Sequence, residues 1–527
     1  MRNHMALGWF YSPSQIGRYI ITRVTSLKPP RHKIRNPVAV LRELTSHQWL
    51  MFLAGFLGWT WDAFDFFTVS MTVTEIAADF NESVTSITWG ITITLMLRSV
   101  GALISGIFAD QYGRKWPMIV CLGLFIVLEL ASGFCNTLSQ FLGVRALYGI
   151  AMGGLFGPAA ATALEDLPHD ARGLLSGCFE MGYAVGYLLA AAFYRALVPT
   201  TSHGWRSLFW FGAGPPVLLI AFRWYLPETN YFRVMVAERE ARARSEGPSS
   251  SAPPTRLATF KAWLRESGSA LKENWFLFVY LVVLMTGFNS VSHGSQDLYP
   301  TFLKDQVGLD ASDTTIVTVV GQIGAFIGAN FFGYISTFFG RRLTMMGTCL
   351  IGGALVPAYI FPRDMRLVAT VFWEQFCVGG VWGPIPIHLM EVNPPVMRAL
   401  LVGLMYQLGN LGSSASATIQ SIIGERFPLP PSAAGKKRYD YGKVMGIFLG
   451  SVWAFILFFL FWGPEMSPEE RAAEAEEADR LEKLRLDGAD MATIGRQKVL
   501  KGEEVGGRVD DGDIPDVEKA STKHLGE

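Results

Sequence analysis

Charged residues are scarce in this chain of 527 residues. Asp, Glu, Lys and Arg make up 17% of it, whereas about 25% is usual in a soluble domain. The net charge is zero, so nothing indicates a nucleic-acid partner. Cysteine is also rare, and all five cysteines lie in apolar runs without metal-ligand spacing, so we expect neither a disulfide framework nor a metal site. We find no nucleophile–base pair and no phosphate-binding loop, which argues against an enzyme and against a cofactor.

Apolar residues, in contrast, make up 50% of the chain, with 54 Gly and 37 Phe. Crossing a bilayer takes about 20 mainly apolar residues in helical form. Such stretches occur at about 49–73, 86–109, 117–134, 141–164, 173–194, 208–225, 276–303, 316–337, 345–361, 367–390, 400–423 and 441–462. The sequence therefore predicts an all-α integral membrane protein with twelve transmembrane helices.

A loop motif occurs twice in the chain, at 106–115 and again at 333–342. The second copy has Thr337 where the first has Asp110, and the matched glycines Gly113 and Gly340 are 227 residues apart. A pair of charged residues also repeats with an offset of 226, Glu165 and Arg172 against Glu391 and Arg398. A repeat of this length predicts two six-helix halves related by an axis along the membrane normal. We place these halves at 48–227 and 273–464.

The segments outside the two halves are polar. Residues 1–47 are basic and carry no signal-peptide pattern, 228–272 form a charged linker, and 465–527 form a charged tail. We expect the linker to be flexible, because its Ser- and Pro-rich middle cannot bury a core, and we expect disorder after about residue 487. Positive charge ahead of the first span places both termini in the cytosol. We also expect the protein to be a monomer in the lipid bilayer.

One stretch of the seventh span is unusually polar for a transmembrane helix. In helical form, Asn289, His293, Gln296 and Pro300 share one face. An amide, an imidazole and the neighbouring Asp297 carboxylate are costly at hydrocarbon depth unless that face lines a pathway. The alternative is a polar seam that only holds helices together.

The second span carries Arg98 at mid-depth. An arginine there needs a partner or an anion, and the candidate partners are Asp62, Asp65 and Glu129. Asp62 and Asp65 lie one turn apart in the first span, where they are interfacial carboxylates or face the pathway.

The repeated loop resembles the motif Gly-x-x-x-Asp-x-x-Gly-Arg-Lys/Arg of the major facilitator superfamily. This resemblance assigns gating or structural roles to Gly106, Asp110, Gly113, Arg114, Arg145, Glu165, Arg172, Gly333, Gly340, Arg341, Glu391 and Arg398. It implies the major facilitator fold and says nothing about the substrate.

A second resemblance is more specific. The stretch 289–301 is similar to the signature Asn-x-x-Ser/Thr-His-x-Ser/Thr-Gln-Asp-x-x-x-Thr of the fungal proton-coupled carboxylate (lactate/pyruvate-type) permeases. It implies symport of a small carboxylate, such as lactate, pyruvate, succinate or malate, with a proton across the plasma membrane. The substrate-binding residues would be Arg98, Asn289, Ser292, Ser295, Gln296, Gln407 and Asn410, and the proton-coupling residues His293 and Asp297.

The chemistry of these residues fits such a role. A carboxylate entering a low-dielectric cavity needs a cation or several donors, which Arg98, the amides and the hydroxyls offer. Coupling needs a group that exchanges a proton near neutral pH, and His293 is the natural candidate. Asp297, one turn on, would hold or share that proton. The alternatives are a facilitator of sugars or other neutral solutes, and a nutrient sensor that does not transport.

Overall fold

The computed structural model describes residues 13–25, 27, 36–82, 84–245, 256–424, 426–430 and 438–465, with scattered positions between 473 and 499. Contacts divide the chain into two compact units. The first unit holds residues 1–229 and 256–472, and the second holds 230–255 and 473–527. All twelve predicted spans lie in the first unit.

The N-terminal half of the first unit is helical throughout its length. Two short helices come first, α1 (Pro13–Thr25) and α2 (Pro37–Arg42). The half itself consists of α3 (Ser46–Phe80), α4 (Val84–Tyr112), α5 (Lys115–Gly133), α6 (Leu138–Gly153), α7 (Phe156–Leu164), α8 (His169–Leu197), α9 (Arg206–Gly212) and α10 (Gly214–Tyr225). The α6/α7 and α9/α10 pairs are each one predicted span broken into two helices.

The C-terminal half repeats this order. It consists of α12 (Arg256–Gln296), α13 (Tyr299–Thr301), the π-helix Phe302–Val307, α14 (Ala311–Phe339), α15 (Arg341–Ile360), α16 (Leu367–Trp382), α17 (Ile385–Val392), the 3₁₀ turn Pro395–Met397, α18 (Arg398–Ser413), α19 (Ser416–Gly424) and α20 (Tyr441–Trp462). The described residues contain only two strands, β1 (Pro428–Leu429) and β2 (Arg438–Tyr439), which pair antiparallel. The predicted all-α class is confirmed.

Each predicted span coincides with one helix or a broken pair of helices. Within the described residues, eight helical segments are long and apolar enough to cross a membrane. The other four predicted spans correspond to α3, to α9/α10, to α16/α17 and to α18/α19. Three of these four are broken pairs, and α3 carries two carboxylates in its middle. A multi-pass membrane protein follows from the apolar helices.

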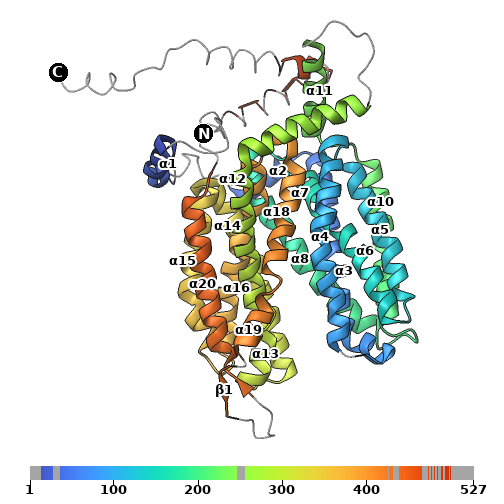
Figure 1. Ribbon diagram of the computed structural model, residues 1–527, viewed down its shortest axis with the longest axis vertical. Helices are drawn as coiled ribbons and strands as arrows, with labels where there is room; N and C mark the ends of the chain where they lie inside the picture. Colours follow the sequence, from blue (N-terminus) through green and yellow to red (C-terminus); the bar gives the residue numbers. More distant parts are fainter. Residues whose placement is uncertain are drawn as a thin grey trace, which may run out of the picture. The chain divides into compact units, whose positions relative to one another are not determined.

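The two halves meet along equivalent helices. Helix α4 packs against α18, and helix α14 packs against α8, as the green-to-orange and blue-to-teal halves of Figure 1 lie side by side. In the repeat α4 corresponds to α14 and α8 to α18, so the two contacts are related by the internal symmetry. Glycines allow the close approach: a Cβ on Gly106 would lie 2.5 Å from the Cα of Leu400, and one on Gly177 would lie 2.4 Å from the carbonyl oxygen of Ala329.

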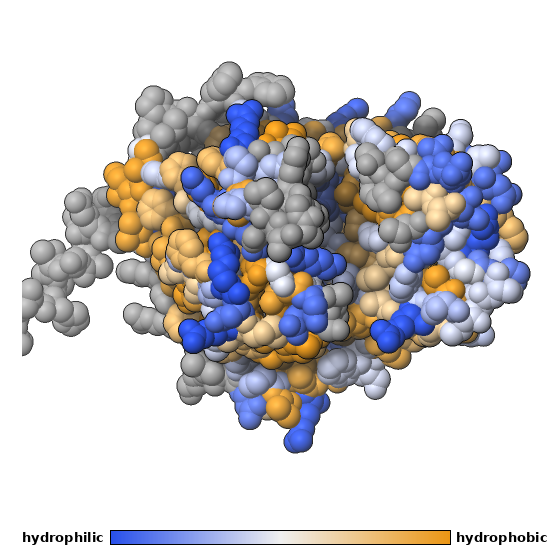
Figure 2. All heavy atoms as spheres, turned by 90° about the horizontal axis from the view of Figure 1, so that it is seen from below, coloured by the Kyte–Doolittle hydropathy of each residue, from blue (hydrophilic) through white to orange (hydrophobic). Residues whose placement is uncertain are grey.

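The surface between the halves is hollowed on one face. Figure 2, which looks at the molecule from the end where α13 and α19 lie, shows a depression between the lobe of the C-terminal half and that of the N-terminal half. At the opposite end the halves are closed by the contacts of Gly106 with Leu400 and of Gly173 with Gly333. Among the described residues, the halves are thus in close contact at one end and separated by a hollow at the other.

The segments predicted as a flexible linker and a disordered tail are partly helical. The stretch predicted as a flexible linker contains α11 (Asn230–Ser245) and the start of α12, whereas its Ser- and Pro-rich middle, 246–255, lies outside the described residues. In the tail, residues 493–497 are helical, Ile494 is buried and Gly495 packs against Ala237 of α11. The prediction of disorder after about 487 was therefore wrong for this stretch, because a small apolar contact with α11 orders it. The residues after 499 lie outside the described part.

Candidate functional site

The polar stretch of the seventh span lies where a long helix ends. Helix α12 runs to Gln296, and the short helix α13 begins at Tyr299 after a turn at Asp297 and Leu298. The sequence-based helix continued to Pro300, but Pro300 has no N–H with which to bond the carbonyl of Gln296. The N–H of Asp297 still donates to the carbonyl of His293, at 3.0 Å. This last turn keeps Asp297 beside the imidazole although the helix stops there.

His293 and Asp297 form a pair on this last turn. The Nδ1 of His293 lies 3.0 Å from Oδ2 of Asp297, and the side chains are 23% and 43% exposed. The Asn410 side chain from α18 is within hydrogen-bonding reach of His293. An ionisable pair that remains open to solvent at hydrocarbon depth can exchange protons with a water-filled pathway.

The Arg98 guanidinium is already paired with a carboxylate of the protein. Its Nη2 donates to Oδ2 of Asp62 at 2.8 Å, and both side chains are almost completely buried. The structure thus selects Asp62 from the three candidate partners. The Nε of Arg98 has no hydrogen-bond partner among the described residues, so one donor of the guanidinium remains available. The Arg98 charge also acts on His293 in the other half.

A second buried acidic cluster lies close to this ion pair. The hydroxyl of Tyr148 donates to Asp65 at 2.5 Å, and Arg145 reaches Glu129 at 3.3 Å and also Ser132. Asp65 and Glu129 are both fully buried. The superfamily resemblance gives Arg145 a structural role, and here it compensates a carboxylate that would otherwise be buried and unpaired.

The amide and hydroxyl side chains of the stretch 289–301 contact different partners. Ser292 accepts a hydrogen bond from the indole of Trp382 at 2.7 Å, and Gln296 donates to Gln375 at 3.0 Å. Asn289 is buried and donates to the carbonyl of Met285 in its own helix. These three side chains already have partners on α12 and α16, so a substrate would have to compete for them.

Ser295 and the two polar residues of the eleventh span are also buried. The Ser295 hydroxyl donates to its own helix, and its carbonyl accepts from Tyr359 at 2.6 Å. Asn410 donates to Gln407 at 3.3 Å, and the Nε2 of Gln407 has no partner within the described part of the chain. The structure therefore brings His293, Asp297, Asn410 and Arg98 together, and it places Asn289 and Ser295 in helix packing.

Aromatic side chains from both halves pack around Tyr406. Its ring stacks on Phe156 at 4.2 Å and meets Trp59 and Trp382 edge-on at 5.7 Å and 5.8 Å. Trp59 and Phe156 belong to the N-terminal half, and Trp382 and Tyr406 belong to the C-terminal half. Trp382 also bonds Ser292, so these rings join the halves next to the signature stretch.

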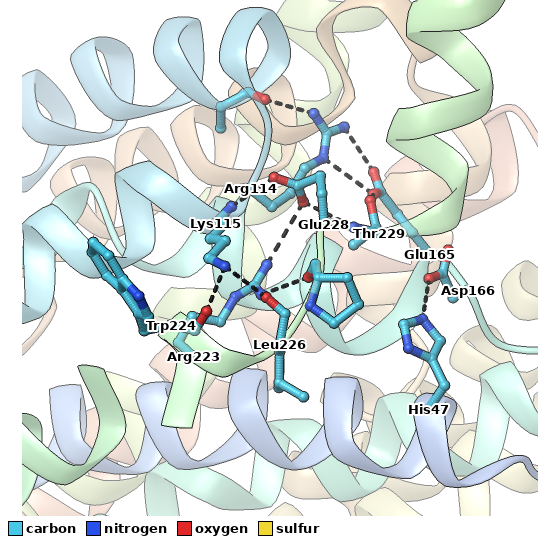
Figure 3. A network of polar contacts seen from close by, with 12 residues as sticks. His47, Arg114, Lys115, Glu165, Asp166, Arg223, Trp224, Leu226, Glu228 and Thr229 are labelled. Carbon is cyan, nitrogen blue, oxygen red and sulfur yellow. Dashed lines mark hydrogen bonds and ion pairs between the residues drawn. The ribbon is translucent and has the colours of Figure 1, made fainter. Parts of the chain in front are cut away.

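The first loop motif is the centre of a network of charges (Figure 3). Arg114 forms a two-pronged contact with Glu165, at 2.8 Å and 3.1 Å, and Thr229 also donates to Glu165. Burial lowers the pKa of the Arg114 guanidinium, but the carboxylates of Glu165 and Asp110 outweigh it and raise that pKa above its ordinary value. Gly113 has a φ of 100°, which glycine adopts without strain.

The same motif connects the two halves. The carboxylate of Asp110 accepts from the N–H groups of Ala399 and Leu400, at 3.1 Å and 2.8 Å, at the start of α18. Two N–H groups at a helix N-terminus hold an anion well, because they have no partner within the helix. In the second copy Arg341 contacts Glu391 at 3.0 Å, and Thr337 accepts from Arg341 at 3.3 Å. The second copy thus lacks the carboxylate that would bind the opposite half.

The remaining motif residues have local roles. Arg172 donates to the carbonyl of Leu167 in the loop before α8, and Gly340 has a φ of 89° between α14 and α15. A Cβ on Gly333 would lie 2.6 Å from the carbonyl oxygen of Gly173. Arg398, the first residue of α18, is buried.

Several residues around the site had no role in the sequence-based prediction. Tyr148, Tyr359 and Trp382 each donate to a polar group of the network, but an aromatic residue in an apolar span carries no signal of such a role. Gln375 was noticeable as an amide in the tenth span. Its pairing with Gln296 could have been expected only from the way the helices rotate.

Comparison with known proteins agrees with this architecture. Residues 36–472 match the family model described as sugar (and other) transporter. A carboxylic acid transporter protein homolog of Saccharomyces cerevisiae is 39% identical over 495 residues, which are 92% of this chain and 80% of the yeast protein. The cis,cis-muconate transport protein of Acinetobacter baylyi is 25% identical, over 71% of this chain and 87% of its own.

A solved structure shows the same fold. The proton:xylose symporter XylE of the major facilitator superfamily aligns with a TM-score of 0.64, covering 81% of this chain and 99% of that chain. The sequence identity is 18%, so this likeness concerns the fold alone.

Proposed function

Since this chain belongs to the sugar (and other) transporter family of the major facilitator superfamily, we propose that it carries small carboxylates across the plasma membrane together with protons. Transporters, not enzymes, make up this family and the relatives found. The observation that carries the proposal is the His293–Asp297 pair, which is part exposed on a transmembrane helix, with the Arg98 charge acting on it from the other half. The yeast relative, named as a carboxylic acid transporter homolog, supports the substrate class.

The proposed binding step uses the donors that remain available. The substrate carboxylate enters from the hollow between the halves and lies between Arg98 and the protonated His293. The unpartnered Nε of Arg98 and the unpartnered Nε2 of Gln407 offer two hydrogen bonds. A carboxylate that leaves water for this depth needs such charge-assisted donors, because its desolvation is otherwise too costly.

The proposed coupling step uses the pair on α12. The proton and the carboxylate cancel each other's charge in the pathway. The free-energy cost of converting between the two open states is therefore lower with both bound than with either ion alone. Release on the opposite side follows when His293 or Asp297 loses its proton to water. Basic residues before the first span support a cytosolic N-terminus, and the twelve-span repeat supports a cytosolic C-terminus.

The test is carboxylate uptake together with alkalinisation of the medium in cells that express the protein at the surface. Lactate, pyruvate, succinate and malate are each supplied in labelled form and also tested as competitors of one another. The acids that are taken up identify the substrate class. We expect wild-type cells to alkalinise the medium when substrate is added, and Asp297→Asn to abolish this signal while substrate exchange without a gradient persists. His293→Ala should have a stronger effect, because it also removes a donor.

A matched control is Asp313→Asn, which changes a half-buried carboxylate in the first turn of α14 and should leave both signals intact. Normal alkalinisation in Asp297→Asn and His293→Ala alike would refute the coupling role. Uptake of none of the four acids would refute the substrate class.

A second candidate is transport of sugars or other neutral solutes. The family description favours it. The buried Arg98–Asp62 pair is also compatible with a neutral solute, because its net charge is zero. Competition of labelled lactate uptake by xylose or glucose separates the two candidates.

A further inference from the structure

Helix α1 presents an apolar side that no described residue covers. Three large aliphatic side chains of this helix are exposed: Ile20 at 49%, Ile21 at 78% and Val24 at 68%. At about 100° per residue they lie within roughly a quarter to a third of the helix circumference. Thr22 is half-buried and lies outside this arc, about 160° from Val24. Helix α1 is therefore amphipathic on its free surface.

The opposite side of α1 is fixed to the C-terminal half. Tyr19 donates to the carbonyl of Trp462 at 2.6 Å, and Arg23, which is 1% exposed, donates to the carbonyl of Gly463 at 2.7 Å. Arg342, at the start of α15, donates to the carbonyl of Arg23 at 3.2 Å and to that of Gly463 at 2.8 Å. These contacts give α1 one orientation on the end of α20, beside α15 (Figure 1).

The attachment point lies at the boundary of the membrane. Helix α20 has 22 residues and is therefore about 33 Å long, close to the thickness of the hydrocarbon core. Its last residue is Trp462, and Phe458, one turn earlier, is 58% exposed on the lipid side. Because α1 bonds Trp462 and Gly463, it lies at the level where hydrocarbon gives way to headgroups.

The charge of this segment matches an acidic lipid surface. Before Glu43 the chain contains no Asp or Glu, while Arg18, Lys28, Arg31 and Lys33 are all basic. Each basic residue near an anionic leaflet contributes about 1 kcal/mol of attraction. A helix with aliphatic residues on one side and basic neighbours is typical of segments that lie in the membrane interface.

We propose that α1 is an interfacial anchor, with Ile20, Ile21 and Val24 inserted among the acyl chains and headgroups of an anionic leaflet while Tyr19 and Arg23 hold the C-terminal half. The lipid occupant is favoured over a protein partner because the apolar side begins at the lipid-exposed end of α20. The anchor fixes the end of α20 and the start of α15 to the membrane surface.

The test measures the depth of single positions in the full-length protein. Val24→Cys and the control Thr22→Cys are labelled with an environment-sensitive fluorophore and reconstituted into vesicles of phosphatidylserine and phosphatidylcholine that contain a brominated lipid. The unsubstituted protein supplies the background of the native cysteines, four of which are buried. Uptake by each variant verifies its fold, and Ile21→Cys provides a second apolar position.

We expect the lipid-borne bromine to quench the label at Val24 and Ile21 several-fold more than the label at Thr22. Replacement of phosphatidylserine by phosphatidylcholine should weaken this quenching. Equal and weak quenching at all positions, as expected if water or a protein covers this side, would overturn the proposal. Equal and strong quenching would overturn the one-sided insertion, and quenching independent of phosphatidylserine would overturn its electrostatic part.

Discussion

Arg98 and Asp62 are one buried ion pair that the proposed substrate must approach. Arg98→Lys keeps the charge but removes the planar fork and the unpartnered Nε, so we expect uptake to fall by about tenfold or more, equivalent to roughly 1.4 kcal/mol or more. Asp62→Asn leaves the guanidinium buried without its counter-ion, which costs about 3–5 kcal/mol of stability. The measurements are uptake at equal surface expression and the thermal unfolding of purified protein.

The double change Asp62→Asn with Arg98→Gln serves as the control, since it removes both charges and should unfold at a higher temperature than Asp62→Asn alone. Uptake by Arg98→Lys equal to wild type would mean that the fork does not contact substrate. The sequence placed Arg98 at mid-depth correctly. It left three possible partners open, because the rotation of α3 and α5 about their axes decides which carboxylate faces α4, and no single span encodes that rotation.

At the scale of helices, α4 and α6 approach each other through glycine. A Cβ on Gly153 would lie 1.8 Å from the carbonyl oxygen of Arg98, whereas one on Gly143, in the same helix, would meet nothing within 4 Å. Gly153→Ala must therefore move α4 and displace Arg98, at a cost of about 1–3 kcal/mol. We expect a lower unfolding temperature and reduced uptake for Gly153→Ala, and neither effect for Gly143→Ala. A stable, active Gly153→Ala protein would show that the two helices separate freely.

The helices themselves were predictable, and the directions of their side chains were only partly so. Apolar length and the 226- to 227-residue repeat predicted twelve spans and two halves, and helices occupy all these positions. The signature stretch predicted one polar face, but the side chains of Asn289 and Ser295 each donate a hydrogen bond to a carbonyl of their own helix, α12. A buried amide can take the nearest carbonyl of its own helix, and a sequence pattern does not contain that competition.

At the scale of the whole molecule, one carboxylate connects the halves where the pathway is closed. Asp110 accepts two N–H groups from α18, and charge-assisted hydrogen bonds contribute about 1.5–3 kcal/mol. We expect Asp110→Asn to shift the protein toward the state that is open on this side. Ser176→Cys, a position fully buried at this closure, reports the shift through its rate of reaction with a membrane-impermeant thiol reagent. The rate should rise by about tenfold or more in the Asp110→Asn background.

Thr337→Val is the matched control, because Thr337 occupies the corresponding position of the second motif and accepts its hydrogen bond from Arg341 of its own half. No change in the reaction rate of Ser176→Cys with Asp110→Asn would mean that the glycine contacts alone keep this side closed.

The presence of Thr337 where the first motif has an aspartate also affects how fast the transporter works. A second carboxylate contact of equal strength would add about 1.5–3 kcal/mol to the barrier that must be crossed before this side opens, and would lengthen the waiting time by roughly ten- to a hundredfold. With a single such contact among the described residues of the two motifs, opening requires the loss of one pair of hydrogen bonds. The unequal halves therefore have a lower barrier to opening on this side than two halves that each carried the carboxylate would have.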